Sequence, residues 1–257
     1  MDQVNVMVNG IPGNVAIQVA THVREESRYA LVPFSLTGPE IETGAYSIND
    51  FKIQLVRPEH REGIIKDIQA AHGPLIGIDF THPSAVNPNA EFYRRHRIPF
   101  VMGTTGGDRE RLNATVRAAS IPAVIAPNMA KQIVGFQAMM AYAAENFPDL
   151  FAGYSLEIRE SHQQGKADTS GTAKAMVTYF NRLGCDVTEE AIVKERNPDK
   201  QKNEWGVPEE FLSGHAWHTY TLTSPDSTTT FSFTHNVNGR EIYVRGTLDA
   251  VDFLADQ

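Results

Sequence analysis

Cysteine is almost absent from this chain, and its scarcity excludes one class of protein. The only thiol, Cys185, cannot form an intramolecular disulfide. A disulfide-stapled secreted scaffold is therefore excluded, and the composition suits a reducing compartment. Cys185 follows Leu183-Gly184 at the expected end of a helix, so we expect it to be structural rather than nucleophilic.

Long hydrophobic runs are also absent. No apolar stretch reaches the roughly 20 residues that a membrane-spanning helix needs, so we expect no membrane partner. The chain enters an apolar strand almost at its first residue, so we expect no signal or transit peptide in this sequence. We therefore expect a cytoplasmic protein, or one of the plastid stroma if a transit peptide has already been removed.

Positive charge is in deficit. The chain has 23 Lys and Arg against 31 Asp and Glu, which gives a formal net charge of -8. A chain of this sign is a poor partner for nucleic acid or for an acidic membrane surface, and we expect neither. Small anionic ligands are still allowed, because a local group of Lys, Arg and backbone N–H groups can bind them.

What the chain does contain is enough apolar material for a sizeable core. Its 257 residues are 41% hydrophobic, and this length suits one large domain or two small ones. We expect no metal site, because no group of His and Cys has the spacing of a ligand cluster.

The first segment has the pattern of a strand, a glycine turn and a helix. Residues 4–8 form an apolar strand, the turn from Gly10 follows at once, and an amphipathic helix continues to Glu25. This is the context that a dinucleotide-binding fingerprint requires, although an ordinary glycine-rich turn is the alternative. Gly10 would allow the tight turn, and Gly13 would let the backbone approach a pyrophosphate at the helix N-terminus.

A second strand is expected at residues 30–34 and ends in Ser35-Leu36-Thr37-Gly38. NAD-preferring sites usually place an Asp or Glu near such a strand end, where it binds the ribose hydroxyls. Here small hydroxyl-bearing residues stand instead, and Glu40 comes later. Because Ser35 and Thr37 would leave room for a 2′-phosphate and hydrogen-bond it, we predict NADPH as the cofactor, with NADH as the alternative.

The strand–turn–helix pattern then recurs. Strands are expected at residues 51–56, 75–80, 99–102 and 123–125, and helices at 59–71, 86–97 and 108–120. The last three strands end in polar or glycine turns, which right-handed crossovers place at one edge of a parallel sheet. The pattern predicts a Rossmann-like parallel-sheet domain over residues 1–128. We expect residues 246–257 to rejoin this domain.

The second half has an α+β pattern. Its expected elements are a helix at 130–146, a strand at 154–158, a helix at 172–183, a solvated loop at 197–208 and an antiparallel hairpin from 216–223 and 229–234. The chain is therefore expected to combine two domains, with the second over residues 129–245.

One segment of the second half concentrates polar chemistry. His162, Lys166 and Ser170-Gly171-Thr172 stand between the expected strand at 154–158 and the helix that follows. We predict His162 and Lys166 on a loop, and the hydroxyls and N–H groups of Ser170-Gly171-Thr172 at the positive helix end, where a carboxylate is well held. A solvated histidine and a plain N-cap are the alternatives for each feature alone. Together the features suggest an acid beside an anion clamp.

These motifs resemble those of the dihydrodipicolinate reductases (4-hydroxy-tetrahydrodipicolinate reductases) of lysine biosynthesis, and most closely the plant-type branch. The resemblance runs over nearly the whole chain and is most specific in Glu160-Ser161-His162-Gln163 with Lys166 and residues 168–172. It also includes residues 10–16, 79–81, 103–106 and 128–132. Gln163 stands where the bacterial-type motif has a second His, and Asn14 stands where the family usually has a basic residue.

The resemblance implies NAD(P)H-dependent reduction of 4-hydroxy-tetrahydrodipicolinate to tetrahydrodipicolinate in the diaminopimelate route. His162 would be the general acid, and Lys166 would contact the substrate, a small cyclic dicarboxylate. The other substrate-binding residues that it implies are Gln163, Ser170, Gly171, Thr172 and Thr105. The cofactor-binding residues are Gly10, Ile11, Pro12, Gly13, Asn14, Val15, Ser35, Thr37, Phe80, Gly103, Thr104, Thr105, Ala126, Pro127, Asn128 and Met129.

The resemblance further implies that the second domain binds substrate and mediates oligomer contacts, in a homodimer or homotetramer. Two other functions stay open. One is another two-domain NAD(P)-dependent dehydrogenase, acting on an amino acid or a semialdehyde; a semialdehyde enzyme needs an activated cysteine, for which Cys185 is poorly placed. The other is a sensor that binds NADPH without turnover, which has no use for an acid such as His162.

Overall fold

The computed structural model describes residues 3–166 and 168–257, and the chain divides into two compact units. Unit 1 consists of the chain up to Lys131 together with Glu241–Gln257, and unit 2 is Gln132–Arg240. The chain thus leaves unit 1 once and returns to it as a carboxyl-terminal segment. The sequence predicts these two junctions at residues 128 and 245.

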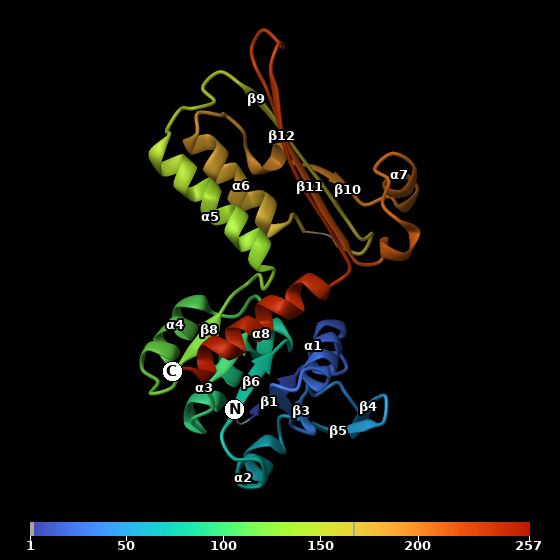
Figure 1. Ribbon diagram of the computed structural model, residues 1–257, viewed down its shortest axis with the longest axis vertical. Helices are drawn as coiled ribbons and strands as arrows, with labels where there is room; N and C mark the ends of the chain where they lie inside the picture. Colours follow the sequence, from blue (N-terminus) through green and yellow to red (C-terminus); the bar gives the residue numbers. More distant parts are fainter. Residues whose placement is uncertain (1–2, 167) are drawn as a thin grey trace. The chain divides into compact units, whose positions relative to one another are not determined.

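A five-stranded parallel sheet in the order β2-β1-β6-β7-β8 forms the centre of unit 1 (Figure 1). Its strands are β1 (Val4–Asn9), β2 (Tyr29–Leu31), β6 (Leu75–Asp79), β7 (Phe100–Met102) and β8 (Ala123–Ile125). The described helices of this unit are α1 (Asn14–Glu25), α2 (Arg61–His72), η1 (Pro83–Ala85), α3 (Val86–Arg95), α4 (Arg109–Arg117) and α8 (Glu241–Ala255).

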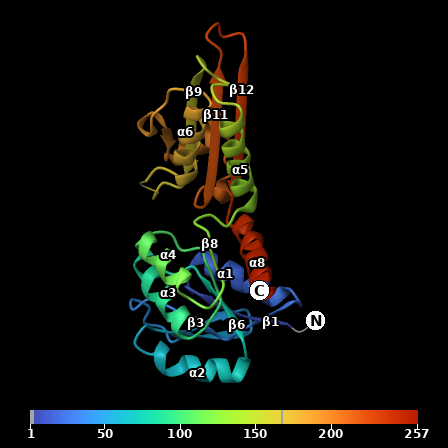
Figure 2. The same cartoon turned by 90° about the vertical axis from the view of Figure 1, so that its left-hand side faces the viewer.

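Helices cover both faces of this sheet because its strands are apolar on both sides. In β1, Val6 and Val8 belong to the core that includes residues of α1 and α8, whereas Met7 between them belongs to the core of α2, α3 and α4. Successive side chains of a strand point to opposite faces, so this alternation requires one helical layer on each side. Figure 2 shows α3 and α4 on one side of the sheet and α8 on the other. The predicted doubly wound domain is confirmed.

The prediction of a single strand at residues 30–34 is wrong. β2 stops at Leu31, and β3 (Phe34–Leu36) belongs to a separate three-stranded sheet in the order β3-β5-β4. Pro33 has no N–H to continue the first ladder, and the N–H of Phe34 donates to the Val32 oxygen at 2.8 Å in a tight turn. The other strands of this sheet are β5 (Phe51–Val56), as predicted, and β4 (Ala45–Ile48), which has no predicted counterpart.

Unit 2 is an α+β unit built on a four-stranded sheet in the order β10-β9-β11-β12 (Figure 1). Its strands are β9 (Ser155–His162), β10 (Val193–Glu195), β11 (His215–Thr223) and β12 (Thr230–Asn238). Its described helices are α5 (Lys131–Asn146), α6 (Gly171–Arg182), η2 (Glu189–Ala191), α7 (Pro198–Asn203) and η3 (Glu209–Phe211). Met140 of α5 and Phe180 of α6 share a core with Ile158 of β9 and Tyr220 of β11, so both long helices lie on one face of the sheet.

The solvated loop expected at residues 197–208 is wrong in part, because it contains α7. Asn197 caps this helix by accepting the N–H groups of Asp199 and Lys200, and Pro198 stands in the first turn. Gln201 is completely buried and donates a hydrogen bond to the carbonyl oxygen of His162 at 2.6 Å. The Asn-Pro start is a helix signal that the polar composition of the segment obscures.

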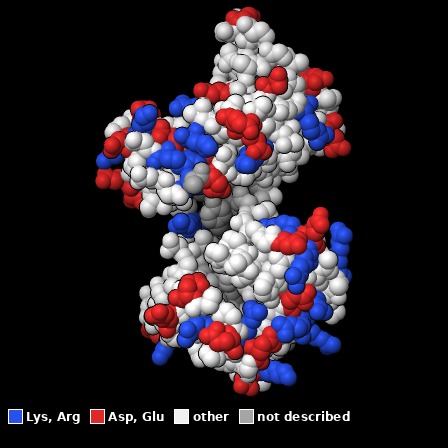
Figure 3. Space-filling model, turned by 180° about the vertical axis from the view of Figure 1, so that it is seen from behind, with Lys and Arg blue, Asp and Glu red and all other residues white. Residues whose placement is uncertain are grey.

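The surface of the chain carries both signs of charge. On the face shown in Figure 3, Lys and Arg side chains are interspersed with Asp and Glu over both units. Such a mixed face offers no broad cationic patch to a polyanion.

None of the described helices has the length and hydropathy of a membrane span.

Candidate functional site

Four turns follow four neighbouring strands at one edge of the unit 1 sheet. The strand residues that lie side by side in the register are Asn9, Asp79, Met102 and Ile125. The next residues in the chain, at the start of each turn, are Gly10, Phe80, Gly103 and Ala126. Because parallel strands point the same way, their carboxyl ends bring these turns together, as predicted for those after β6, β7 and β8, at the edge where α/β proteins bind nucleotides.

A buried carboxylate fixes the shape of this edge. Asp79 is fully buried and accepts hydrogen bonds from the hydroxyls of Tyr93 (2.8 Å) and Thr104 (2.7 Å) and from the amide of Asn89 (2.9 Å). The N–H and hydroxyl of Thr81 donate to it as well. The carboxylate of Asp79 therefore fixes the conformation of the loops after β6 and β7. In the sequence Asp79 was visible only as part of a motif, since its partners lie far along the chain.

The glycine turn after β1 has the close backbone packing that a nucleotide-binding turn needs. Gly10 has a φ of +105°, and a Cβ there would lie 2.2 Å from the carbonyl oxygen of Phe80. The N–H of Gly13 donates to the Gly10 oxygen at 2.7 Å, and a Cβ on Gly13 would lie 2.8 Å from that oxygen. Glycine is required at both positions. The N-terminus of α1 follows with Asn14, which is exposed, and Val15, and its N–H groups favour a phosphate.

A cavity of about 830 Å³ opens beside this turn within unit 1. The predicted residues that line it are Gly10, Pro12, Gly13, Thr37 and Phe80. Its size and position suit part of a dinucleotide cofactor. Ile11 lies in the core instead, and its backbone N–H and carbonyl oxygen bond the hydroxyls of Ser35 (3.3 Å) and Thr37 (2.9 Å).

The hydroxyls expected to bind a 2′-phosphate are therefore engaged inside the fold. Ser35 is fully buried and accepts the Ile11 N–H, while Thr37 donates its hydroxyl to the Ile11 oxygen. The cavity presents one charge of each sign instead. The carboxylate of Glu40 folds over Gly38, where a Cβ would lie 2.2 Å from one of its oxygens.

The positive charge at this cavity is Arg61, on the first turn of α2. Its guanidinium lies 4.8 Å from the centre of the Phe92 ring and donates to Asn89 at 2.7 Å. These two contacts hold the cation in place at the cavity wall. His82, which also lines the cavity, bonds Ser84 at 2.9 Å and is a loop residue.

The turns after β7 and β8 hold the other residues expected at the cofactor. The Phe80 ring packs on Gly103, where a Cβ would lie 2.2 Å from a ring carbon. The Thr104 hydroxyl donates to Asp79 and is buried, whereas Thr105 is exposed. Thr105 is therefore the open hydroxyl of this turn.

After β8 come Ala126, Pro127, Asn128 and Met129. The N–H of Ala126 donates to the Met102 oxygen at 3.1 Å, which continues the sheet edge. Asn128 accepts the N–H of Ala130 at 2.9 Å, and Met129 is buried in the core. This turn is thus held by its own backbone and side chains, with Pro127 exposed.

His162 ends a strand rather than standing on a loop, so its predicted placement is wrong. It is the last residue of β9 and pairs with Ala216 of β11. β9 is an interior strand between β10 and β11, and two ladders hold its polar end extended. The polar run Glu160-Ser161-His162 suggested a loop because nothing local reveals these long-range pairings.

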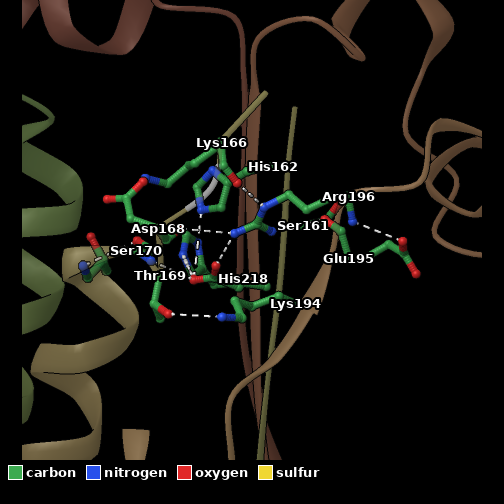
Figure 4. Close-up of polar contacts among 12 residues, drawn as sticks. Ser161, His162, Lys166, Asp168, Thr169, Ser170, Lys194, Glu195, Arg196 and His218 are labelled. Carbon is green, nitrogen blue, oxygen red and sulfur yellow. Dashed lines mark hydrogen bonds and ion pairs between the residues drawn. The ribbon is translucent and has the colours of Figure 1, made fainter. Parts of the chain in front are cut away.

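The His162 imidazole is buried beside two cations (Figure 4). Burial first, and then the charges of Arg196 and Lys166, lower the pKa of His162 to about 3. The ring is therefore uncharged at neutral pH. Its Nε2 is buried and has no hydrogen-bond partner within residues 3–166 and 168–257. A buried nitrogen without a partner is costly, and such groups concentrate where ligands bind or protons move.

Glu160 and His218 complete a small buried cluster around this ring. The rings of His162 and His218 meet edge-on with centres 5.0 Å apart, and their Nε2 atoms lie 4.0 and 3.9 Å from one oxygen of Glu160. Ligand atoms of the three residues lie within 4.8 Å of one another, a grouping that the sequence spacing did not predict. Arg196 and the Ser170 N–H already engage both carboxylate oxygens, so we assign no metal to the cluster.

Lys166 stands on the loop after β9, as predicted, with its side chain 23% exposed. Its ammonium donates to Asp168 at 2.7 Å, and its N–H donates to the oxygen of Gln163 at 3.0 Å. Hydrogen bonding to Lys166 lowers the pKa of Asp168. Because Asp168 is 77% exposed, this ion pair is weak and can give way to another carboxylate.

The start of α6 uses part of the predicted anion clamp for its own capping. The Ser170 hydroxyl accepts the N–H of Thr172 at 3.2 Å, and the Ser170 N–H donates to Glu160 at 3.0 Å. Ser170 therefore acts within the fold. Gly171 is exposed, with open space where a Cβ would stand, so its backbone and the positive end of the helix are accessible to an anion.

Arg196 is, with His218, a residue of this site that the sequence did not reveal. It follows β10, and the parallel pairing of β10 with β9 brings its guanidinium to Glu160 and to the backbone of Lys166. A three-residue edge strand has too little periodicity to be recognised beforehand.

Cys185 has the properties of a packing residue. It is buried in the core of unit 2, and burial raises the pKa of its thiol. A nucleophilic cysteine needs the opposite shift, so this thiol does not suit a semialdehyde dehydrogenase.

Known families match both halves of the chain. Family models described as "Dihydrodipicolinate reductase, N-terminus" and "Dihydrodipicolinate reductase, C-terminus" match residues 4–129 and 133–257. The chain is 46% identical over 252 residues to 4-hydroxy-tetrahydrodipicolinate reductase 1, chloroplastic, of Arabidopsis thaliana, which covers 98% of this chain and 72% of that protein. It is 28% identical over 188 residues to 4-hydroxy-tetrahydrodipicolinate reductase of Alkaliphilus metalliredigens, covering 72% of this chain and 77% of that one.

Solved structures share the fold. Dipicolinate-bound dihydrodipicolinate reductase from Paenisporosarcina sp. TG-14 aligns with a TM-score of 0.70 and 19% identity, covering 99% of this chain and 96% of that one. Aspartate semialdehyde dehydrogenase II from Vibrio cholerae aligns with a TM-score of 0.57 and 11% identity, covering 100% and 99%. At these identities the likeness concerns the fold alone.

Proposed function

The chain belongs to the dihydrodipicolinate reductase family, and we propose that it reduces 4-hydroxy-tetrahydrodipicolinate to tetrahydrodipicolinate with NAD(P)H, in the diaminopimelate route of lysine biosynthesis. One observation carries the proposal within this family. The end of β9 and the loop after it place a buried imidazole, whose Nε2 has no hydrogen-bond partner among the described residues, an ammonium and a helix N-terminus in one short segment.

The cofactor is proposed to bind at the sheet edge of unit 1. Gly10, Gly13 and the N-terminus of α1 would hold its pyrophosphate, and the turns after β6, β7 and β8 would lie towards the nicotinamide. Bound there, NAD(P)H supplies the hydride. The glycine turn and the cavity of about 830 Å³ fit this group.

The protein supplies the proton and holds the carboxylates. The 4-hydroxyl of the substrate leaves as water, and the conjugated imine that remains takes up one hydride and one proton. A substrate that receives a hydride builds up electron density, which a positioned acid discharges, and His162 would hold that proton at Nε2. Lys166, Gly171 and Thr172 would bind a carboxylate through the ammonium and the helix N-terminus. Gln163 and Thr105 are the further contacts that we propose for the substrate.

The direct test is oxidation of NADPH or NADH by the purified protein, with substrate made fresh from pyruvate and aspartate semialdehyde. Turnover that requires the freshly made substrate is the expected result. Tight cofactor binding without turnover would favour a sensor. NADP⁺ reduction that needs aspartate semialdehyde and inorganic phosphate, and no pyruvate, would favour a semialdehyde dehydrogenase.

Replacing Lys166 by alanine is expected to weaken substrate use. The variant loses one charge-assisted contact with a carboxylate, so KM should rise roughly tenfold to a hundredfold, with kcat within a fewfold of wild type. Steady-state kinetics at saturating cofactor measure both constants, and titration without substrate measures the Kd of NAD(P)H, which should not change.

Lys174→Ala is the matched control. It removes the same charge from the first turn of α6, where Lys174 is 46% exposed and pairs with Glu189. Its KM should stay near the wild-type value. Equal effects of the two variants would mean that net charge, rather than a contact by Lys166, sets KM.

We propose that the cavity accepts NADPH as well as NADH. Arg61 is the cation available to a 2′-phosphate, and Glu40 is the carboxylate available to free ribose hydroxyls. The charge of Arg61 favours binding of NADPH, whereas the charge of Glu40 opposes it. The hydroxyls of Ser35 and Thr37 are engaged in the fold, so we propose Arg61 in their place as the residue that binds the 2′-phosphate of NADPH.

Replacing Glu40 by glutamine is expected to improve NADPH binding about tenfold relative to NADH, because a like charge beside the 2′-phosphate is removed. The measurement is the Kd of each nucleotide from its fluorescence. Glu42→Gln, with the same charge change on an exposed neighbour outside the cavity lining, is the control. An unchanged ratio in the Glu40 variant would remove this carboxylate from the ribose site.

We propose a homodimer or homotetramer that forms through unit 2. Large apolar side chains are exposed there, among them Met139 and Tyr142 of α5 at 64% and 63% and Phe231 of β12 at 43%. Sedimentation velocity tests the assembly.

A place in the plastid stroma is proposed from the Arabidopsis relatives, whose names include "chloroplastic".

A further inference from the structure

Arg196 holds the backbone of the loop after β9 at two points. It directly follows β10, whose pairing with β9 sets Glu195 opposite Ser161. The side chain is 18% exposed, and its Nε donates to the carbonyl oxygen of Lys166 at 2.8 Å. Its Nη2 donates to the carbonyl oxygen of Asp168 at 3.3 Å (Figure 4). An edge strand therefore anchors a loop that is distant in sequence.

Glu160 extends this contact to helix α6. Its carboxylate is fully buried; one oxygen accepts from Nη2 of Arg196, and the other accepts the N–H of Ser170 at 3.0 Å. Ser170 is the N-cap of α6. A continuous connection therefore runs from β10 through a guanidinium and a carboxylate to the helix N-terminus.

Every nitrogen of the guanidinium donates at least one hydrogen bond. Its remaining nitrogen, Nη1, donates to the carbonyl oxygen of Glu195 at 2.9 Å. A planar guanidinium has donors in fixed directions and can reach a carboxylate and several carbonyls at once, whereas a lysine ammonium at the same place is a single point. Removing either member of the buried pair leaves the other charge uncompensated.

We propose that Arg196 is a positioning residue for dicarboxylate recognition: through Glu160 and the backbone of Lys166 it holds the carboxylate loop, residues 163–166 and 168–170, in its anion-binding conformation. The choice of ligand rests on the proposed function. A loop that is already held loses less conformational entropy when a ligand binds, so ligand affinity is the quantity that Arg196 controls.

The test compares Arg196→Lys, Arg196→Met and Glu160→Gln with the wild-type chain. Arg182→Met is the matched control, since it removes the same group from an exposed position at the end of α6. Two quantities are measured on the full chain. One is the Kd of dipicolinate with NADH present, and the other is hydrogen exchange of the amides of Lys166 and Ser170 without any ligand.

Both Arg196 variants should bind dipicolinate roughly tenfold to a hundredfold more weakly, and the two amides should exchange at least about tenfold faster. KM should rise more than kcat falls, and the Kd of NADH alone should stay within about twofold of wild type. Arg196→Lys keeps the charge, so a loss in this variant assigns the effect to the geometry of the guanidinium. Glu160→Gln, which keeps the shape of the side chain, should also speed exchange of the Ser170 amide.

Wild-type affinity and exchange in Arg196→Lys would overturn the inference, because charge alone would then be enough. If Arg196→Met fails to fold, Arg196→Lys and Glu160→Gln still decide the question. A wild-type chain that binds dipicolinate but reduces no substrate would refute the proposed function, while the exchange rates would still report on Arg196.

Discussion

His162→Gln is expected to lower kcat by about 100- to 10,000-fold and to leave NAD(P)H binding unchanged. Glutamine keeps a hydrogen-bonding side chain of similar length at the end of β9 but cannot deliver a proton to the substrate. The nucleotide-binding turn and cavity are built entirely from unit 1, which this substitution does not touch. Stopped-flow and steady-state kinetics measure turnover, and nucleotide fluorescence measures binding.

His60→Gln is the control for this substitution. His60 lies in unit 1, and its side chain is 69% exposed, so the change should leave both quantities at wild-type values. A loss of cofactor binding in the His162 variant as large as its loss of turnover would show that the ring is structural. Unchanged turnover would transfer the acid role to another group.

The pH dependence of the same reaction follows from the burial of His162. In the free protein, burial and two nearby cations lower the pKa of His162 to about 3, so its charged form becomes tenfold rarer with each pH unit above that value. We expect kcat/KM, which reports the free enzyme, to fall steadily from pH 5 to pH 8.

Bound substrate should change the pH dependence of turnover. Its carboxylates oppose the charges of Lys166 and Arg196 that lower the pKa of His162, so kcat should hold to a higher pH than kcat/KM. An inflection of kcat/KM near pH 6.5, the ordinary imidazole value, would point instead to a solvated acid elsewhere.

The unit 1 fold was predictable because its signals are local. Within unit 1, the apolar strands β1, β6 and β7 are each followed by a turn and a helix, and Gly10 and Gly13 stand where the backbone has no room for a Cβ. The errors came where tertiary contacts prevail over local pattern. Pro33 divides an apolar run between two sheets, and α7 forms in a segment whose composition resembles a solvated loop.

The candidate site was predictable as a set of residues but not as an arrangement. Lys166 and Ser170 could be found from the spacing of charge and hydroxyls before a helix. The strand position of His162 depends on two ladders with distant partners, and the role of Arg196 depends on a short parallel pairing. Ser35 and Thr37 show the same limit, because sequence identifies a hydroxyl but not whether the fold has already engaged it.

Acid is expected to destabilise unit 2 by at least about 4 kcal/mol between pH 7 and pH 5, which for a unit of roughly 100 residues corresponds to a fall in Tm of roughly 15 to 20 °C. Burial lowers the pKa of His162 to about 3 and that of His235 to about 4, and it also lowers the pKa values of His215 and His218. The unfolded chain takes up protons near pH 6.5, whereas the folded chain does not until the pH is far lower.

The sign of the effect follows from this difference in proton uptake. Each buried imidazole stabilises the fold fully above about pH 6.5, and this contribution is lost as the pH falls, at about 1.4 kcal/mol per unit. For His162 and His235 this gives about 2 kcal/mol each at pH 5. The other two rings act in the same direction.

Tryptophan fluorescence can isolate this unit, because both tryptophans of the chain, Trp205 and Trp217, lie in it. Urea titrations followed by fluorescence at pH 7 and pH 5 give the two free energies of unfolding. His235→Asn should reduce the difference between them by about 2 kcal/mol, since one titrating ring is removed, whereas His60→Asn, a change in unit 1, should not alter it. Equal free energies of unfolding at pH 7 and pH 5 would mean that the folded unit binds these protons as readily as the unfolded chain does. The protonated rings would then have partners in the folded state.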